Sequence, residues 1–188
     1  KDNQLSFDLI NLKENNNEIF IKELKLNKNF KIIDIENFSI NYRNDRKILN
    51  NLNLKKEINS SFTIKGESFD ASRMIDNIMD NNEENLSVFK NLNSKINVRI
   101  KKTYIDKINY LENLYGDIVY VNNKINNLKL ESNFPNKKKI NLSIETKNNL
   151  EVITKLFSSY PKPLVKRYKF IKGFEEGYLD FYSSKTGG

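Results

Sequence analysis

Catalysis by this chain would have to rely on Asp, Glu, Lys, Tyr, Ser and Thr, because the sequence contains neither His nor Cys. The lack of Cys excludes a thiol nucleophile and a zinc finger, and the lack of His excludes an imidazole base. Two adjacent carboxylate pairs, Glu83 with Glu84 and Glu175 with Glu176, are the candidates for acid–base chemistry. Neighbouring side chains in a loop point apart, and the sequence has no phosphate-binding loop, dinucleotide fingerprint or calcium loop. We therefore expect no enzyme, no cofactor and no metal site.

The chain is basic, with a formal net charge of +8, which favours a negatively charged partner such as nucleic acid or an anionic membrane surface. An AT-rich coding sequence would give the same lysine excess. Residues 137–139 are three lysines, and residues 162–172 mix cations with Tyr168 and Phe170. Such clusters contact lipid headgroups or single-stranded nucleic acid, but they also form solvated turns and protected sheet edges. Because only five of the 32 cations are Arg and lysine is spread over every segment, the sequence argues against a nucleic-acid partner.

Most of the chain alternates apolar and polar residues with a period of two, which is typical of half-buried strands. Asn-rich segments separate these runs, and Asn tolerates the left-handed backbone of tight turns. The pattern predicts a long antiparallel meander of about ten strands. The alternating runs are residues 5–9, 19–26, 33–40, 51–54, 62–66, 96–100, 128–130, 140–144 and 178–182.

Two segments have helical spacing instead. Asp70 is a good helix cap and precedes one apolar helix face. For a second helix, Asn148 or Asn149 is the expected cap, and two prolines are expected to end it. The expected faces are Ala71, Met74, Ile75 and Ile78 in the first helix, and Leu150, Ile153, Leu156 and Phe157 in the second, before Pro161 and Pro163.

The two helical segments suggest a unit of strand, turn and helix that occurs twice, about 80 residues apart, although two copies of so common a unit can arise by chance. The fold class is therefore mainly β with two short helices. Residues 1–188 are expected to form a single segment, with possible sub-units 1–90 and 91–188. No run reaches the length of a membrane-spanning helix, and no signal peptide is evident. Because the chain starts at Lys1 and ends at Gly188, we expect a piece of a longer, repeat-like protein.

An open sheet with one apolar face has to cover that face with helices, a second sheet or a lipid. Two short helices cover little of a ten-stranded sheet, so either a lipid groove or a closed β-sandwich would resolve the mismatch. The strand pattern alone favours the sandwich. The residues expected on the apolar face, as lipid contacts or as ordinary core, are Ile96, Val98, Ile100, Leu128, Leu130, Ile140, Leu142 and Ile144.

Three stretches resemble the AsmA-like group of bacterial envelope proteins, which includes AsmA, TamB and YhdP, with YhdP the nearest. Residues 62–75 look like the family's strand that ends near a glycine, Gly66, and is followed by an Asp that opens a helix, Asp70. Residues 142–157, with the restart at Gly173 and Gly177, are similar to the family's helix and following strand. Residues 97–134 resemble its linked strand pairs. The family's paired glycines are separated here by Phe-Glu-Glu.

This resemblance implies a long, curled sheet with an apolar concave face in the periplasm, held at the inner membrane by a part of the parent protein outside this chain. It also implies phospholipid binding or transport for outer-membrane biogenesis. The expected partners are phospholipid, adjoining segments of the same longer chain and the envelope membrane. The alternatives are a structural β-sandwich without a ligand and a basic nucleic-acid-binding module.

Overall fold

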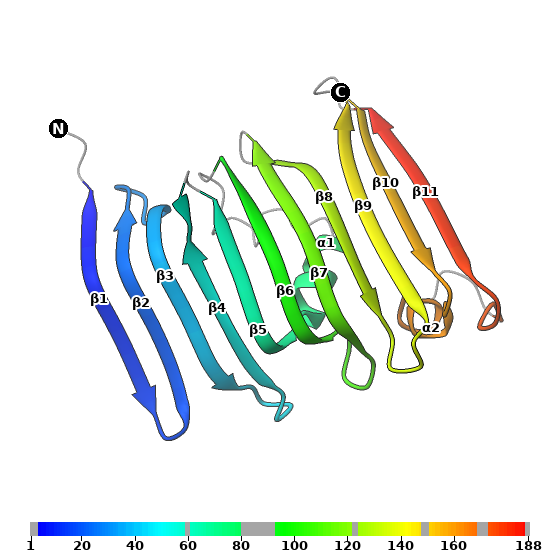
Figure 1. Cartoon of the computed structure of the whole chain (residues 1–188), viewed down its shortest axis with the longest axis horizontal. Coiled ribbons are helices and arrows are strands. Elements are labelled where there is room, and N and C mark those ends of the chain that lie inside the picture. The colour runs from blue at the N-terminus through cyan, green and yellow to red at the C-terminus, as the bar shows by residue number, and fades with distance from the viewer. Residues whose placement is uncertain are drawn as a thin grey trace.

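A computed structural model describes residues 4–58, 61–79, 93–121, 124–147, 151–168 and 173–186. Within these residues the strands form one open sheet of eleven strands, and their order in space is their order in the chain (Figure 1). The elements are β1 (Leu5–Glu14), β2 (Asn17–Leu26), β3 (Ile32–Arg43), β4 (Leu49–Lys56), β5 (Phe62–Asp70), α1 (Ser72–Met79), β6 (Ser94–Tyr104), β7 (Tyr110–Val121), β8 (Lys124–Asn133), β9 (Lys139–Lys147), β10 (Glu151–Ser158), α2 (Lys162–Tyr168) and β11 (Leu179–Thr186).

The expected fold class, mainly β with two short helices, is confirmed. The closed β-sandwich is wrong, because the described strands form one sheet and not two packed sheets. The expectation of a wholly antiparallel meander is also wrong at one junction, where β5 and β6 pair in parallel. Parallel neighbours need a crossover connection, and α1 lies in that crossover. The parallel junction joins the two expected sub-units, and the sheet runs through it without interruption.

The second helix does not lie where the sequence predicted it. Residues 151–158 form strand β10, and α2 starts at Lys162, after the first of the two prolines. The backbone N–H groups of Leu164 and Val165 both bond to the carbonyl of Pro161. Proline fits the first turn of a helix, where no N–H is needed, so Pro161 and Pro163 start α2 and do not end a helix. The predicted caps Asn148 and Asn149, and Leu150, lie outside the described residues.

A strand–helix pair therefore does occur twice, as β5–α1 and β10–α2, but the second helix lies one strand later than expected. The first helix has the expected position. Ala71 is buried ahead of it and Ile75 packs inward, whereas Met74 is 43% exposed and is not a core residue. The side chain of Ile78 is outside the described set.

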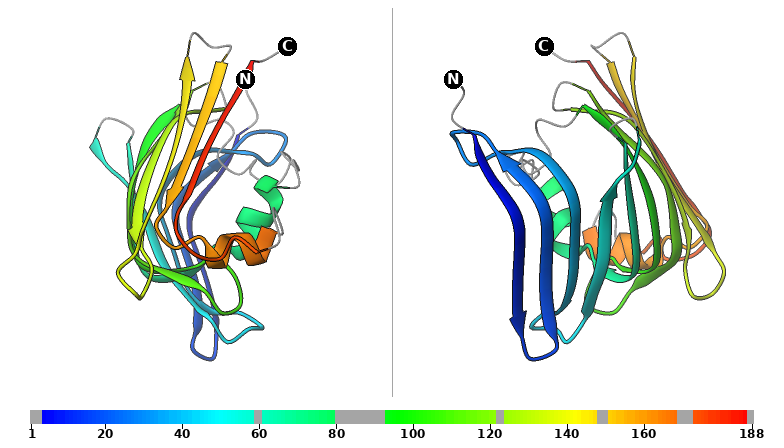
Figure 2. Two further views of the ribbon diagram at one scale, coloured as in Figure 1. Left: turned by 90° about the vertical axis from the view of Figure 1, so that its right-hand side faces the viewer. Right: turned by 60° about the vertical axis from the view of Figure 1, so that its left-hand side comes forward.

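Irregular residues bend the strands. Glu23 in β2 and Asn113 in β7 have positive φ angles of 51° and 55°, and the register shifts in the β4–β5 and β7–β8 pairs. Each irregularity changes which residues face inward, so Leu111 and Leu114 both point to the core although they are three positions apart. Bulges of this kind increase the local bend and twist of a sheet. Figure 2 shows the resulting curl, with α1 and α2 inside the curve.

The core has two parts, both on the face that bears the helices, which we call the inner face. The strand cluster consists only of strand residues, with Leu24, Ile35, Leu54, Phe62, Ile96, Val98 and Ile100 at its centre. The helix cluster joins Leu164 of α2 to Ile105, Leu111, Phe134 and Ile140, and Ile75 of α1 packs against it. The helices thus anchor one end of the concavity.

Replacing Leu164 with alanine is expected to lower the free energy of unfolding by about 3 kcal/mol, because it removes a buried side chain (6% exposed) from the helix cluster and leaves a cavity. Denaturant unfolding followed by circular dichroism measures the change. Lys166→Ala, on the same helix but exposed, is the control and should change stability by less than about 1 kcal/mol. Equal effects of the two substitutions would contradict the role given to Leu164.

Candidate functional site

An unbroken apolar row crosses the inner face from one edge of the sheet to the other. Its members are directly opposite one another in every strand pair, including the parallel one. At about 4.8 Å between neighbouring strands, ten steps span about 48 Å along the sheet. We call this the apolar row: Ile10, Ile21, Phe38, Leu54, Ile64, Val98, Gly116, Leu130, Leu142, Leu156 and Phe181.

The register places all eight predicted groove residues on the inner face. Ile96, Val98 and Ile100 are in the strand cluster, and Leu130 packs against it. Ile140 belongs to the helix cluster. The remaining three lie beside them in the register, with Leu128 buried and Leu142 and Ile144 half-buried.

The predicted groove residues lie only in β6, β8 and β9, and the inner face extends beyond them into the first half of the sheet. Ile21, Phe38, Leu54 and Ile64 continue the apolar row through β2 to β5. Their alternation was visible in the sequence. What the sequence lacked was the register that aligns them with Val98, because that alignment depends on the parallel junction.

Both edges of the sheet expose apolar side chains. On β1, Leu5, Phe7 and Leu12 are exposed and lie opposite inner-face residues of β2. On β11, Phe181 is 45% exposed and ends the apolar row. Exposed apolar edge strands are surfaces on which further strands or ligands pack.

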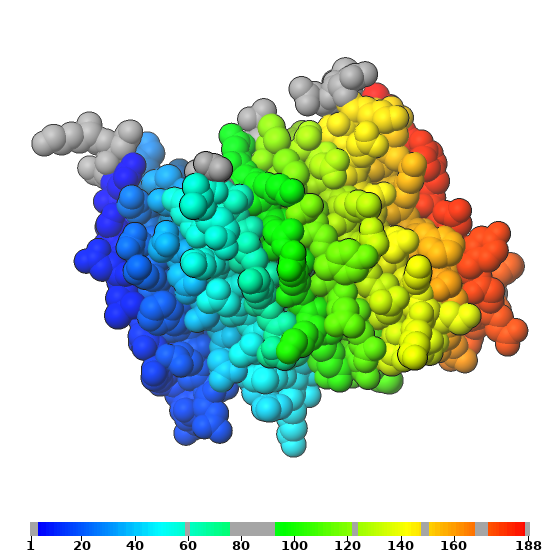
Figure 3. Space-filling model, viewed as in Figure 1, coloured from blue at the N-terminus to red at the C-terminus, as the bar shows by residue number. Residues whose placement is uncertain are grey.

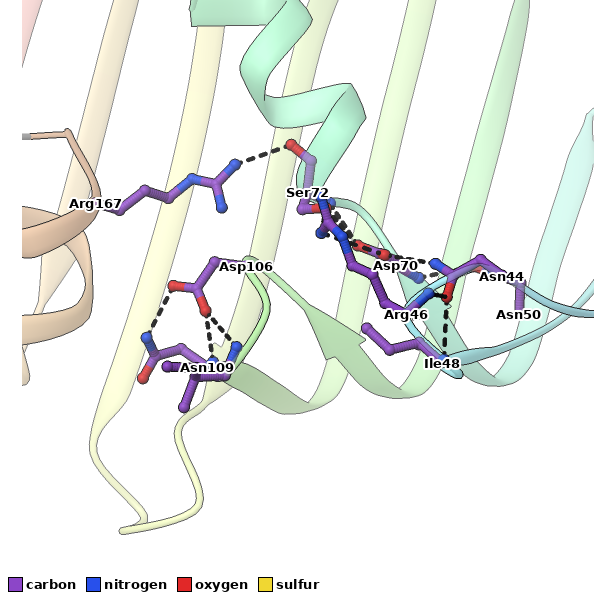
Figure 4. Close-up of polar contacts among 10 residues, drawn as sticks. Asn44, Arg46, Ile48, Asn50, Asp70, Ser72, Asp106, Asn109 and Arg167 are labelled. Atoms are coloured by element: carbon purple, nitrogen blue, oxygen red, sulfur yellow. Dashed lines mark hydrogen bonds and ion pairs between the residues drawn. The ribbon is translucent and has the colours of Figure 1, made fainter.

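A polar network fixes the start of α1 (Figure 4). The carboxylate of Asp70, 8% exposed, accepts the backbone N–H of Ser72 at 3.1 Å and the Asn44 amide at 2.7 Å. The Arg46 guanidinium lies 3.6 Å from the same carboxylate and donates to the Ser72 hydroxyl at 2.6 Å. From α2, Arg167 donates to the Ser72 carbonyl at 2.9 Å. Asp70 thus binds the first N–H of the helix, the role expected of a cap, and the network ties both helices to the β3–β4 turn.

The network changes the ionisation of its acid. Burial alone would raise the pKa of Asp70, but hydrogen bonds from Ser72 and Asn44 and the charge of Arg46 lower it below its ordinary value. Asp106, beside the same site, has a lowered pKa for similar reasons: burial raises it, and donors on Asn109 and Ile108 and the charge of Arg167 outweigh that effect. Because Ser72 is only 1% exposed, it cannot meet a substrate. The network joins both helices to the sheet, and we call it the latch: Asn44, Arg46, Asp70, Ser72 and Arg167.

The two basic segments, residues 137–139 and 162–172, contribute to a tight turn and to ion pairs of α2. Lys137 and Lys138 lie in the tight turn between β8 and β9, where Lys137 has a φ of 62°. Lys162 and Lys166 of α2 both pair with Glu175, at 3.2 and 3.5 Å, and these lysines lower the pKa of that carboxyl. Glu83 and Glu84 lie outside the described residues. Tyr168 ends α2, and Phe170 is also outside the described set.

Within the described residues, no three acidic side chains are grouped so that they could hold a metal ion. Neither described helix has the length and apolar composition needed to cross a bilayer. No family model, no curated protein and no solved structure matches the chain.

Proposed function

We propose that this chain is a segment of an AsmA-like envelope protein and that its concave inner face holds the acyl chains of phospholipids. The observation that supports this function is the apolar row, which is free of polar side chains across all eleven strands. Most of its side chains are only half-buried, among them Phe38, Leu130 and Leu142. A path of this length and chemistry suits an acyl chain, which gains about 0.8 kcal/mol for each buried CH₂ group.

The proposed setting is the periplasm, with the parent protein anchored at the inner membrane and phospholipid moving toward the outer membrane. Adjoining segments of the same chain would extend the sheet at its apolar edges. Nucleic acid is not proposed as a partner, because lysines such as Lys13, Lys56 and Lys95 lie on separate strands and form ion pairs with carboxylates, so they give no single basic footprint. We propose no catalytic activity.

Site-specific photocrosslinking tests the lipid path without placing a charge in the core. The photoreactive residue p-benzoyl-phenylalanine would replace Leu142, which is half-buried on the apolar row. The matched control replaces Ser143, the next residue of β9, whose side chain faces the opposite side of the sheet. After irradiation in cells grown with labelled phosphate, we expect a lipid adduct from position 142 and none from position 143.

Mass spectrometry of an organic extract from the purified, folded chain gives an independent measurement, and phospholipid is the expected result. Adducts from neither position, together with an extract free of lipid, would overturn the proposed function. Equal adducts from both positions would also overturn it, because the lipid would then be bound without regard to the inner face.

A further inference from the structure

A groove lies on the outer face of the sheet, opposite the helices. It has a volume of about 620 Å³ and is lined by residues of β2 to β7, among them the outward-facing Ser39, Asn53, Lys65, Arg99 and Tyr115. Figure 3 views this face, with those strands coloured from blue to green. The outward-facing side chains of the groove are polar or charged, unlike those of the apolar row, so a different kind of ligand has to be considered for it.

The carboxylates that line the groove are neutralised. Glu18 pairs with Lys13 at 3.0 Å, and Glu67 pairs with Lys101 at 2.8 Å. Two further cations line the groove, Lys65 and Arg99, and neither forms an ion pair within the described part of the chain. The groove therefore presents two uncompensated positive charges.

These two cations are direct neighbours. In the parallel register of β5 and β6, Lys65 is opposite Arg99. Like charges directly opposite one another destabilise a sheet. An anion bound between Lys65 and Arg99 would remove this repulsion. The same row places Asn53 beside Lys65 and Tyr115 beside Arg99. An amide, an ammonium, a guanidinium and a phenol thus stand side by side across four strands.

We propose that this groove binds a phosphate monoester group between Lys65 and Arg99. A phosphate monoester has a charge of about −1.5 to −2 near neutral pH, which matches the two free cations, whereas a carboxylate would neutralise only one. The planar guanidinium of Arg99 suits two phosphate oxygens at once, and Lys65 supplies a point charge beside it. The Asn53 amide provides a further donor at one end of the row, whereas at the other end the Tyr115 hydroxyl donates to Glu131 at 2.6 Å.

Binding to the 188-residue chain is measured with two probes at low salt. Glycerol 3-phosphate, followed by NMR shifts of backbone amides in β4 to β7, tests a soluble phosphate. Phosphatidylcholine vesicles with and without phosphatidic acid, followed by co-sedimentation, test the same group in a lipid headgroup. We expect saturable binding to at least one probe, and the probe that binds identifies the source of the phosphate.

The variant Lys65→Gln with Arg99→Gln is expected to weaken that binding by about tenfold or more. Its matched control is Lys124→Gln with Lys147→Gln, which removes two exposed lysines outside the groove and should change the affinity less than about twofold. Because all four side chains are exposed, both variants should fold, and each single groove variant should show a smaller loss.

Two results would overturn the proposal: no saturable binding of either probe, or equal losses in the groove variant and its control. Neither result bears on the lipid path, because the groove and the apolar row lie on opposite faces of the sheet and the crosslinking at position 142 reports only on the inner face.

Discussion

Replacing Gly116 with alanine is expected to lower the free energy of unfolding by about 4 kcal/mol. A Cβ atom at this position would overlap the backbone carbonyl of Lys129 on the neighbouring strand, and no side-chain rotation relieves a clash with backbone. The φ angle of Gly116 is 152°, which L-residues rarely adopt, so strain adds to the overlap. Urea denaturation, followed by circular dichroism, measures the effect.

Gly173 provides the control that separates strain from overlap. Its φ angle is 100°, but nothing lies within 4 Å of the place where a Cβ would be added. Gly173→Ala should therefore cost about 1 kcal/mol, from backbone strain alone. If both substitutions cost the same, the close approach of β8 to β7 at Gly116 is not what requires glycine there.

Replacing Asp70 with asparagine is the second substitution with a large expected effect. It should lower the free energy of unfolding by about 3 kcal/mol near neutral pH. The reason is that Asn lacks the negative charge of the Asp70 carboxylate, which pairs with Arg46 and accepts the helix N–H at a site where the side chain is 8% exposed. Asparagine keeps the size of the side chain, so the loss reports on charge and hydrogen bonding and not on a cavity.

The same substitution should change how stability depends on pH. Because folding lowers the pKa of Asp70, its contribution is fully present above the pKa of the unfolded chain, about 4, and is lost as the pH falls through the folded value. Wild-type protein should therefore lose stability steeply below about pH 4, and Asp70→Asn less steeply. Asp106 will leave part of the dependence in the variant, since its pKa is lowered as well.

Unfolding curves measured at several pH values test this prediction, with Asp180→Asn as the control, because Asp180 is an exposed residue of β11. The control should keep the pH profile of the wild type. Parallel profiles for wild type and Asp70→Asn would show that the latch does not depend on the charge of this carboxylate.

The alternation of residues predicted the strands wherever the alternation is regular. β6 and β9 are the clearest cases, because Ile96, Val98 and Ile100, and Ile140, Leu142 and Ile144, keep a strict period of two. In β7 the irregular residue Asn113 shifts the inward-facing positions, so no single period describes the strand. Local pattern fails at such positions because the bulge is set by pairing with neighbouring strands.

The error at β10 has a different cause. Ile153, Leu156 and Phe157 are spaced three and four apart, which fits a helical face, and the same segment also reads as a short apolar strand. Its pairing with β9 and β11 decides for the strand. A short apolar segment of this kind forms a strand when neighbouring strands pair with it. The local sequence does not show which strands those are.

The candidate sites depend on the parallel junction to different extents. The inner-face residues of β6, β8 and β9 were predictable, because they follow from alternation alone. The phosphate groove was not, because Lys65 and Arg99 are far apart in the sequence and only the pairing of β5 with β6 brings them together. The pairing of β5 with β6 therefore brings Lys65 beside Arg99 in the outer groove. The same pairing aligns the two halves of the apolar row.

That same junction sets the direction of the last strand. Eleven strands that were all antiparallel would leave β1 and β11 running the same way. One parallel step reverses the second half, so β1 and β11 run in opposite directions, and the start of β1 lies at the same rim of the sheet as the end of β11 (Figure 1). A strand that followed β11 through a tight turn would run in the direction of β1. Copies joined by short hairpins would therefore share one strand direction, with their inner faces on the same side of a continuous sheet.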